Sequence, residues 1–355
     1  MQNSNRLFLD IHVIQTVPPS NINRDDTGSP KTAQYGGVRR ARVSSQSWKK
    51  AMRDYFRLKG EESCVGVRTL QIVQYVANKV RKINEDIPQE EAIKLAESVI
   101  NKAGIKTKDH AAKALFFMGD KQADALAKAA IDGVSDKKEL QQLLTNNPAV
   151  DISLFGRMVA DDPSLNEDAS AQVAHAISTH AVQTEFDYFT ALDDLSPEDN
   201  AGAGMIGTLE YNSSTLYRYA NVAVHELQRQ LGDIEAVKKA LKLFIEAFTN
   251  SMPTGKINTF ANQTLPQAVI VSLRSDRPVN LVSAFENPIQ SREGFVNQSI
   301  ERLGEEFIKV ERFTEKSVKT VYMTLDGQKI AALQAVDNID TLKNLVDTIT
   351  NAISF

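Results

Sequence analysis

The chain has 355 residues, of which 42% are hydrophobic and 24% are charged. This composition is that of an ordinary globular protein and excludes collagen, a disordered tail and a disulfide scaffold. Single hydrophobic cores stop growing near roughly 250 to 300 residues, so the length predicts two lobes or one domain with a large insertion. The net charge of −4 would by itself argue against a polyanionic partner.

The single cysteine and the lack of long apolar runs bear on the location of the protein. Cys64 has no second cysteine to pair with, which excludes an internal disulfide and fits a reducing compartment. The apolar stretch from Leu7 to Val17 is interrupted by Asp10 and His12, so we do not expect a signal peptide there. No stretch approaches the ~20 apolar residues of a membrane span. We therefore expect a cytoplasmic protein.

The N-terminal part predicts a strand, a long connection and a helix. Residues 7–14 alternate with a period of two, which predicts a half-buried strand that ends at Pro18. Residues 21–43 are polar and contain glycines, and we interpret them as one long irregular segment. Ser44 and Ser45 then offer an N-cap for an amphipathic helix.

The rest of the chain predicts an α+β fold. Residues 68–145 are rich in Ala, Lys, Glu, Leu and Gln with short Pro and Gly breaks, the pattern of several short helices. Strand-like or buried segments follow at 150–155, 186–192, 209–224 and 269–273, and helices at 169–178, 233–248 and 341–352. This order predicts an antiparallel ferredoxin-like sheet interrupted by a helical lobe.

Charge is distributed unevenly along the chain. Residues 151–210 contain twelve carboxylates and, among Lys and Arg, only Arg157. Residues 31–53 contain seven basic side chains and no acidic one: Lys31, Arg39, Arg40, Arg42, Lys49, Lys50 and Arg53. Charges farther apart than a Debye length of ~8 Å are largely screened from one another, so the local field at the basic stretch persists despite the negative total. A polyanion would bind there.

Three features favour an anion-binding function for the basic stretch over a merely solvated face, which is the alternative interpretation. Its cations repel one another because no acidic side chain lies between them. Neighbouring glycines permit close approach to the backbone. The amides of Ser44 and Ser45, at a helix start, are expected to be unpaired and to bind a phosphate, with Lys49 and Arg53 one helical turn apart.

Two further motifs suggest other chemistry. Residues 202–207 match the GxGxxG pattern, but they are not flanked by the strand and helix that dinucleotide binding needs, so we interpret them as an apolar-tipped projecting hairpin, or else an ordinary surface loop. Asp25 and Asp26 could hold a divalent metal and cleave RNA, although adjacent aspartates in a turn more often form local hydrogen bonds. The histidines have no metal-ligand spacing, and we expect no metal or cofactor.

The basic stretch contains the sequence Tyr35-Gly-Gly-Val-Arg-Arg-Ala-Arg-Val-Ser-Ser-Gln-Ser-Trp-Lys-Lys-Ala-Met-Arg53. This segment resembles the signature of the CasC family, the repeated backbone subunit of the type I-E CRISPR surveillance complex called Cascade. Shorter segments resemble the family in the same order along the chain: Asn23–Asp26, Gly156–Met158, Ala174–His180, Phe189–Leu195, Tyr217–Asn221 and Asn280–Glu286.

The resemblance implies a hand-shaped protein. An RRM-like palm is expected at 1–59 and 181–355, helical fingers at 60–180, and a thumb hairpin at about 194–216. Members of this family polymerise along a CRISPR RNA, with each thumb folding over the RNA and displacing a base. The residues that would contact RNA are Arg24, Lys31, Arg39, Arg40, Arg42, Ser44, Gln46, Lys49, Lys50, Arg53 and Met158; those at the thumb are Gly202, Gly204, Met205, Ile206 and Gly207.

The expected function is therefore that of a non-catalytic, multi-copy subunit that presents a guide RNA for pairing with target DNA. Its partners would be CRISPR RNA, target DNA through the guide, other copies of itself in a helical filament and the remaining Cascade subunits. Two alternatives stay open: a metal-dependent ribonuclease that uses Asp25 and Asp26, and a basic RNA-binding module that does not oligomerise.

Overall fold

The computed structural model describes residues 6–61, 64–191 and 205–354, and it divides into two compact units. The helical unit comprises Met1–Leu7, Arg53–Gln172 and Val222–Phe244. The sheet unit comprises Phe8–Met52, Val173–Asn221 and Ile245–Phe355. These limits differ from the expected lobes mainly in that the helical unit begins within the first long helix and includes a second, later segment of the chain.

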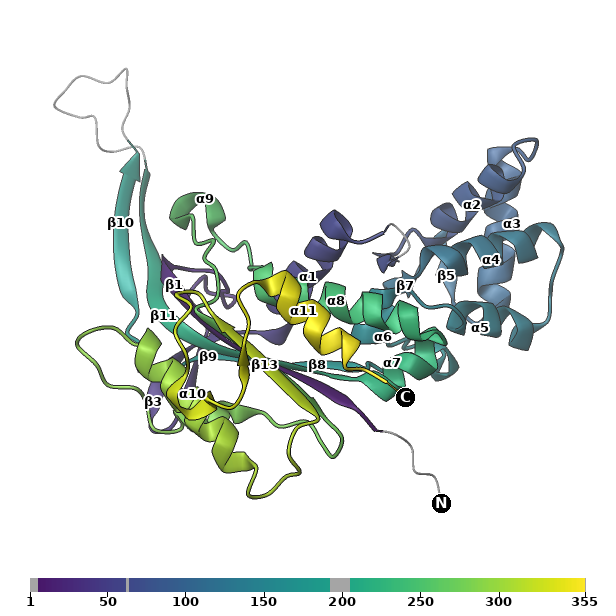
Figure 1. Cartoon of the computed structure of the whole chain (residues 1–355). Coiled ribbons are helices and arrows are strands. Elements are labelled where there is room, and N and C mark those ends of the chain that lie inside the picture. Colours follow the sequence, from purple (N-terminus) through teal and green to yellow (C-terminus); the bar gives the residue numbers. More distant parts are fainter. Residues whose placement is uncertain (1–5, 62–63, 192–204, 355) are drawn as a thin grey trace. The chain divides into compact units, whose positions relative to one another are not determined.

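A ten-stranded, mainly antiparallel sheet organises the sheet unit, as counted over the described residues (Figure 1). Its main path runs in the order β14-β13-β12-β1-β11-β9-β3-β2, and β8 and β10 pair with β11 off this path. The strands are β1 (Phe8–Ser20), β2 (Thr32–Tyr35), β3 (Val38–Val43), β8 (Ala171–Val173), β9 (Ala176–Ser178), β10 (Glu185–Ala191), β11 (Met205–Ala223), β12 (Ala268–Arg274), β13 (Lys319–Thr324) and β14 (Asp337–Asn338). The expected α+β class is confirmed.

Strand β1 is buried on both faces, not on one as its alternating pattern predicts. Leu9, Ile11 and Val13 are fully buried, and so are Asp10 and His12 between them. The reason is that the polar side chains find partners inside: Asp10 accepts a hydrogen bond from the hydroxyl of Tyr219 at 2.8 Å. The alternating pattern therefore located the strand, but it predicted one exposed face, whereas helices cover both faces of the sheet.

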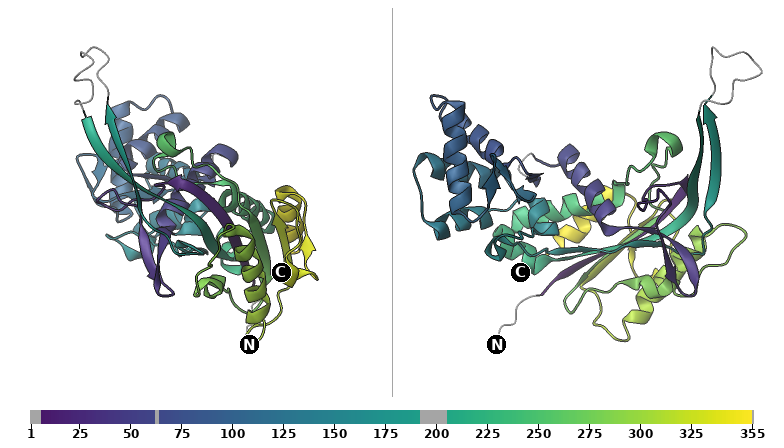
Figure 2. Two further views of the ribbon diagram at one scale, coloured as in Figure 1. Left: turned by 90° about the vertical axis from the view of Figure 1, so that its left-hand side faces the viewer. Right: turned by 180° about the vertical axis from the view of Figure 1, so that it is seen from behind.

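Helices α10 (Val296–Val310) and α11 (Leu342–Asn351) cover opposite faces of the sheet (Figures 1 and 2). Ile300, Leu303 and Phe307 of α10 pack on the face that carries Ile14 and Tyr322, while α11 contacts β12 and β13. Two short helical segments, η4 (Leu281–Phe285) and η5 (Ala331–Leu333), complete the α10 layer. The long helix α8 (Ile234–Asn250) and the short α9 (Ile257–Phe260) precede β12.

The helical unit has its own core, as the composition of residues 68–145 predicts. Helices α2 (Ile72–Ile83), α3 (Gln89–Lys102), α4 (Asp120–Ile131) and α5 (Lys137–Thr145) bury one apolar cluster that includes Val76, Ala96 and Leu126. Small strands join them: β4 (Val67–Thr69) pairs with β7 (Phe116–Met118), and β5 (Thr107–Lys108) with β6 (Ala111–Ala112). Helices α6 (Val150–Phe155) and α7 (Val224–Leu231) and the 3-10 turn η2 (Pro163–Leu165) follow in this unit.

Three local expectations differ from the structure. The segment 150–155, expected to be strand-like or buried, is buried but forms helix α6, because a short buried apolar run has no periodicity that separates helix from strand. The helix expected at 169–178 is the pair of strands β8 and β9. The irregular segment 21–43 contains the hairpin β2–β3, whose two-residue turn is Gly36-Gly37 with φ values of 59° and 77°; such a turn requires positive φ at both positions.

Strands β10 and β11 form a long two-stranded hairpin that projects from the sheet (Figures 1 and 2). Seven residue pairs, from Glu185 with Tyr211 to Ala191 with Met205, set its register. The expected bounds of about 194–216 lie partly outside the described residues, and the pairing already begins at Glu185. Met205 and Ile206, expected at the apolar tip of this hairpin, instead belong to β11 and pair with Ala191 and Thr190. Gly202 and Gly204 lie outside the described residues.

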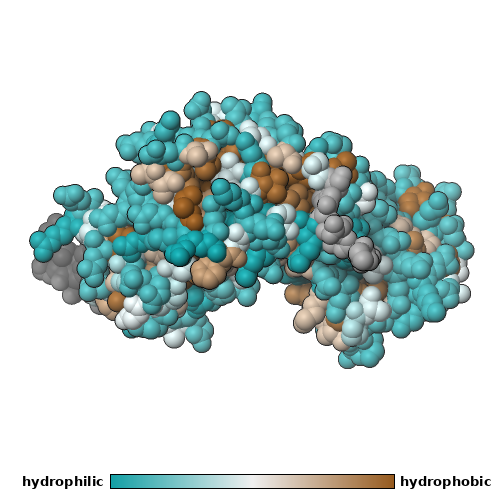
Figure 3. All heavy atoms as spheres, turned by 60° about the horizontal axis from the view of Figure 1, so that its bottom comes forward, coloured by the Kyte–Doolittle hydropathy of each residue, from teal (hydrophilic) through white to brown (hydrophobic). Residues whose placement is uncertain are grey.

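No described helix is both long and apolar enough to cross a membrane. On the face drawn in Figure 3, hydrophilic residues predominate and apolar residues form separate patches among them. Some exposed large apolar side chains are normal on a protein surface. Phe186 and Tyr188 on β10 are each 65% exposed.

Candidate nucleic-acid interface

The candidate interface lies in the sheet unit, where the segment after β1 meets β3 and β11. A backbone ladder connects these parts: the amide of Lys31 donates to the carbonyl of Asn23 at 2.9 Å, and the amide of Arg42 donates to the carbonyl of Lys31 at 2.9 Å. The segment 21–31 is therefore tied along the edge of the β2–β3 hairpin. These hydrogen bonds place Asn23, Lys31 and Arg42 side by side in one array, although they are not neighbours in the sequence.

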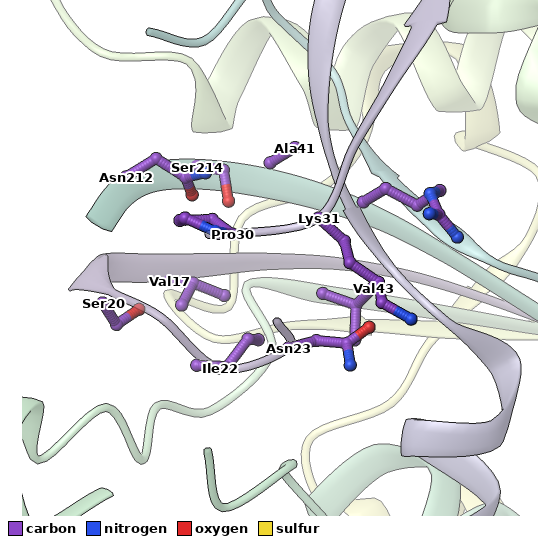
Figure 4. A pocket seen from close by; sticks show the side chains of 11 residues that line it. Val17, Ser20, Ile22, Asn23, Pro30, Lys31, Ala41, Val43, Asn212 and Ser214 are labelled. Carbon is purple, nitrogen blue, oxygen red and sulfur yellow. The ribbon is translucent and has the colours of Figure 1, made fainter. Parts of the chain in front are cut away.

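A small pocket opens at this array (Figure 4). Its volume is about 20 Å³, which is room for about one water molecule. Figure 4 shows the polar ends of Lys31 and Asn23 pointing to the same side of the pocket, while Asn212 and Ser214 contribute from β11. Val17, Ser20, Ile22, Pro30, Ala41, Arg42 and Val43 complete the lining. The pocket is large enough for a single oxygen atom.

Four basic residues of this region have no carboxylate partner among the described residues: Arg24, Lys31, Arg39 and Arg42. Arg24 and Arg39 are exposed, and Lys31 and Arg42 are half-buried. Arg42 is held in place by its Nε, which donates to the carbonyl of Thr32 at 3.1 Å. Two of these cations, Lys31 and Arg42, line the pocket, and cations without counter-charges are chemically suited to an anion.

Arg40 is buried, whereas its neighbours Arg39 and Arg42 reach the surface. Its side chain is fully buried, and its guanidinium donates to the backbone carbonyls of Tyr35, Ser178 and Phe285 at 3.1, 2.9 and 2.7 Å. Burial lowers its pKa. Arg40 therefore holds the β2–β3 hairpin to the sheet and to η4, and each of its three guanidinium nitrogens already donates to a backbone carbonyl. Sequence reasoning missed this because Arg39, Arg40 and Arg42 look alike in a basic run.

The start of α1 (Ser45–Lys59) is fixed by two hydrogen bonds. Ser44 caps the helix, since its hydroxyl accepts from the amide of Ser47 at 3.4 Å. The Ser44 amide, expected to be unpaired, is not: it donates to Oδ1 of Asn23 at 2.8 Å. The expectation of a free Ser44 amide is wrong, because the preceding loop supplies the acceptor.

Other site candidates on α1 face different surroundings. Gln46 and Lys50 are exposed, whereas Lys49 is half-buried, and burial lowers the pKa of the Lys49 ammonium. Trp48 faces inward and is fully buried. The helix thus presents Gln46 and Lys50 outward while its opposite side is anchored in the core.

Arg218 of β11 is that anchor. Its guanidinium carbon lies 3.7 Å from the centre of the Trp48 ring and 4.6 Å from that of Phe248, and it donates to Oε1 of Gln15 and to the carbonyl of Phe248. Burial lowers its pKa to about 9. A cation that contacts two aromatic rings holds the N-terminal half of α1 on the sheet.

Two site candidates belong to the helical unit. Arg53 is ion-paired: its Nε lies 2.8 Å from Oδ2 of the buried Asp151, and its Nη2 donates to the carbonyl of Gly66 at 3.1 Å. Met158 is 84% exposed and lies in the helical unit, whereas the pocket belongs to the sheet unit.

Asp25 lies in a local turn. Its Oδ1 accepts hydrogen bonds from the amide and hydroxyl of Thr27 at 2.9 and 2.7 Å and from the amide of Ser29 at 3.0 Å. The hydrogen bond from the Thr27 hydroxyl is the main cause that lowers the pKa of Asp25. Asp26 is exposed. Within the described part of the chain, no group of three His, Cys, Asp or Glu side chains could hold a metal ion.

The candidates at the hairpin are only partly described. Met205, Ile206 and Gly207 belong to β11, and the ring of Phe189 lies so close to Gly207 that a Cβ there would be 2.5 Å from it. Residues that sequence reasoning did not select but the structure brings to the interface are Asn23, His175, Asn212 and Ser214. Single polar residues in separate segments produce no local pattern, so no sequence signal marked them.

By sequence comparison, this chain belongs to the family of CT1975-like proteins, whose model matches residues 9–348. Two solved structures are similar over nearly the whole chain. One is a chain of a pre-nicking CRISPR RNA-guided surveillance complex; it is 33% identical with a TM-score of 0.86, and the match covers 97% of this chain and 99% of that chain. Another is a chain of a CRISPR RNA-guided surveillance complex; it is 29% identical with a TM-score of 0.75, and the match covers 98% of this chain and 100% of that chain. No curated protein matches the chain.

Proposed function

We propose that this protein is a non-catalytic, multi-copy backbone subunit of a type I-E Cascade complex, which binds CRISPR RNA along its phosphates and presents the guide to target DNA. The observation that carries the proposal is the set of unpaired cations around a one-oxygen pocket, in a chain similar over nearly its whole length to chains of CRISPR RNA-guided complexes.

Contact with phosphates rather than bases agrees with the geometry. A pocket of about 20 Å³ admits one phosphate oxygen. Arg and Lys side chains are suited to phosphate, and phosphate contacts carry no direct sequence information. A guide must vary in sequence and keep its base edges free for the target, so a subunit that grips only the backbone meets both needs.

The structure also suggests how the roles divide among the residues. We assign RNA contacts to Arg24, Lys31, Arg39, Arg42, Gln46, Lys49 and Lys50, and a wedging role to Met158, which is 84% exposed. Ser44 and Arg40 support the backbone of the interface, and Arg53 is ion-paired with Asp151. In this proposal the sheet unit supplies an RRM-like palm, the helical unit supplies fingers, and the β10–β11 hairpin is the thumb.

Catalysis by Asp25 is not part of this proposal, because Oδ1 of this residue already accepts three local hydrogen bonds. A direct check is to incubate the assembled complex with RNA complementary to the guide and with magnesium. Intact RNA is expected. Cleavage that disappears in Asp25→Ala would overturn the non-catalytic assignment and support the ribonuclease alternative.

The main test is RNA binding by the purified protein, followed by fluorescence anisotropy with two single-stranded RNAs of unrelated sequence. Lys31→Ala combined with Arg39→Ala should weaken binding of both RNAs alike and reduce the log-log salt slope by about 0.7 for each phosphate that the variant no longer neutralises. The matched control is Lys343→Ala, an exposed lysine on α11 without an ion pair among the described residues. Weakening confined to one RNA sequence would contradict backbone binding.

Assembly is tested by mass. Co-expression with a CRISPR RNA should give particles that contain several copies of this chain, whereas the Lys31 and Arg39 double variant should remain smaller. A wild-type protein that binds RNA but stays monomeric on it would favour the non-oligomerising RNA-binding module.

A further inference from the structure

His175 lies next to the pocket without lining it. This residue stands between β8 and β9, and its Nδ1 is 3.0 Å from Nη1 of Arg42. A guanidinium has only donors, so Nδ1 must accept this hydrogen bond and the neutral imidazole must carry its proton on Nε2. Because the contact between His175 and Arg42 is exposed to solvent, an N–H donor is presented beside the unpaired cations of the interface.

The surroundings of His175 are positively charged. Arg42 approaches from β3 and Lys31 from the segment before β2, and both also line the pocket. Partial burial is the main cause that lowers the pKa of His175, and these two cations lower it further. In the free protein, the lowered pKa of His175 therefore favours the neutral imidazole.

We propose that His175 is a further RNA-backbone contact, which donates from Nε2 to a phosphate oxygen and makes RNA binding tighter as the pH falls, because the bound phosphate favours uptake of a proton on the imidazole. The inference rests on the proposed function. It adds to that function a contact residue and a pH dependence that the basic run does not require, since Lys and Arg keep their charge throughout the neutral and mildly acidic range.

The direction of the effect follows from charge. A phosphate beside His175 is an opposite charge and raises the pKa of the imidazole in the complex above its lowered value in the free protein. Protonation also converts Nδ1 from acceptor to donor, which releases Nη1 of Arg42 for a second phosphate oxygen. Since the complex binds the proton more tightly than the free protein, affinity must rise on acidification, by at most about tenfold per pH unit for one proton.

The experiment uses the full chain and a labelled oligouridylate, whose base does not titrate in the mildly acidic to neutral range, at constant ionic strength. We expect the wild type to bind several-fold more tightly at about pH 5.5 than at about pH 7.5. His175→Gln, which keeps an N–H donor but cannot take up a proton, should bind nearly as the wild type does at neutral pH and lose the tightening at low pH. His175→Ala should bind more weakly than the wild type at neutral pH and should also lose the tightening at low pH.

The matched control is His110→Gln. His110 is exposed and its Nδ1 lies 2.8 Å from Oε2 of Glu97 in the helical unit, so this variant should keep the wild-type pH dependence. A second measurement follows the carbon-13 resonance of the His175 ring through a pH titration, whose midpoint should move to higher pH when oligouridylate is added.

The outcomes separate the two proposals. RNA binding that is independent of pH in the wild type, or a His175→Gln variant that keeps the wild-type tightening, would overturn the role of His175 and leave the proposed function standing. A wild type that binds no RNA at any pH would overturn the proposed function and this inference together. An unchanged ring titration in the presence of bound RNA would show that no phosphate lies at His175.

Discussion

Oδ1 of Asn23 accepts a 2.8 Å hydrogen bond from the amide of Ser44, the residue that caps α1. This contact joins the loop after β1 to the start of the helix and fixes the distance between Lys31, which follows Asn23 in the loop, and the side chains of the first helical turn. Under the proposed function, a phosphate at the pocket would meet a loop that hydrogen bonds hold to the helix start and to β3.

Substitution of Asn23 separates the structural part of this contact from the electrostatic part. Asn23→Ala should lower the free energy of unfolding by about 1 kcal/mol, because the Ser44 amide loses its acceptor. Asn23→Asp keeps an acceptor of the same size and should retain stability, yet weaken RNA binding more than Asn23→Ala does, since it places a negative charge beside Lys31. Urea unfolding and RNA anisotropy measure the two effects. Wild-type RNA affinity in Asn23→Asp would show that the pocket is not the binding site.

Two adjacent arginines should respond in opposite ways. Arg40→Ala leaves the buried carbonyls of Tyr35, Ser178 and Phe285 without donors, and should reduce the free energy of unfolding by on the order of 3 kcal/mol. Arg39→Ala removes an exposed cation, and should change stability by less than about 0.5 kcal/mol while weakening RNA binding. Denaturant titration measures the free energy of unfolding of both variants. Equal stabilities would mean that the guanidinium bonds of Arg40 contribute nothing net.

The buried pair Asp10 and His12 should give opposite pH dependences of stability. Burial raises the pKa of Asp10 to about 6 and lowers that of His12 to about 3. Acidification below about pH 6 therefore stabilises the fold through Asp10, which is protonated more readily when folded, and destabilises it below about pH 6.5 through His12, which is protonated more readily when unfolded. Between about pH 4 and 6 the two contributions oppose each other.

Single variants expose each contribution. Relative to the wild type, Asp10→Asn should lose stability as the pH falls from about 6 to about 4, and His12→Asn should gain it, each by at most about 1.4 kcal/mol per pH unit. Urea unfolding at several pH values gives both slopes. Slopes of the same sign in the two variants would contradict the assignment of these groups as buried and oppositely shifted.

The exposed aromatic side chains of β10 should matter for assembly but not for folding. Phe186 and Tyr188 are each 65% exposed and lie two residues apart, on the same face of the strand. Replacing both with Ser should leave the free energy of unfolding within about 0.5 kcal/mol of the wild type, and should reduce the mass of particles formed on CRISPR RNA. Thr190→Ala on the same strand is the matched control. Unimpaired assembly of the double variant would remove the hairpin aromatics from the proposed thumb function.

The sequence alone determined the elements whose pattern is local. The alternation of residues 7–14 located β1, the Ser44-Ser45 pair located the start of α1, and the composition of 68–145 predicted the helices α2 to α5. The Gly36-Gly37 turn of the β2–β3 hairpin was also within reach, because Gly-Gly between two alternating segments is a hairpin signal. The resemblance of the basic stretch to a known family pointed to RNA before any contact was seen.

Only the tertiary structure decided which members of the basic run are available to a ligand. Arg40 donates to buried backbone carbonyls and Arg53 is ion-paired with Asp151, while Arg39 and Arg42 have no carboxylate partner among the described residues. Residues 171–178 form strands because β11 and β3 supply hydrogen-bonding partners, which no local propensity records. His175 beside Arg42, and Asn23 beside Ser44, are likewise products of contacts between distant segments. Charge and periodicity are properties of neighbours along the chain, whereas burial and hydrogen-bond partners depend on which segments the fold brings together.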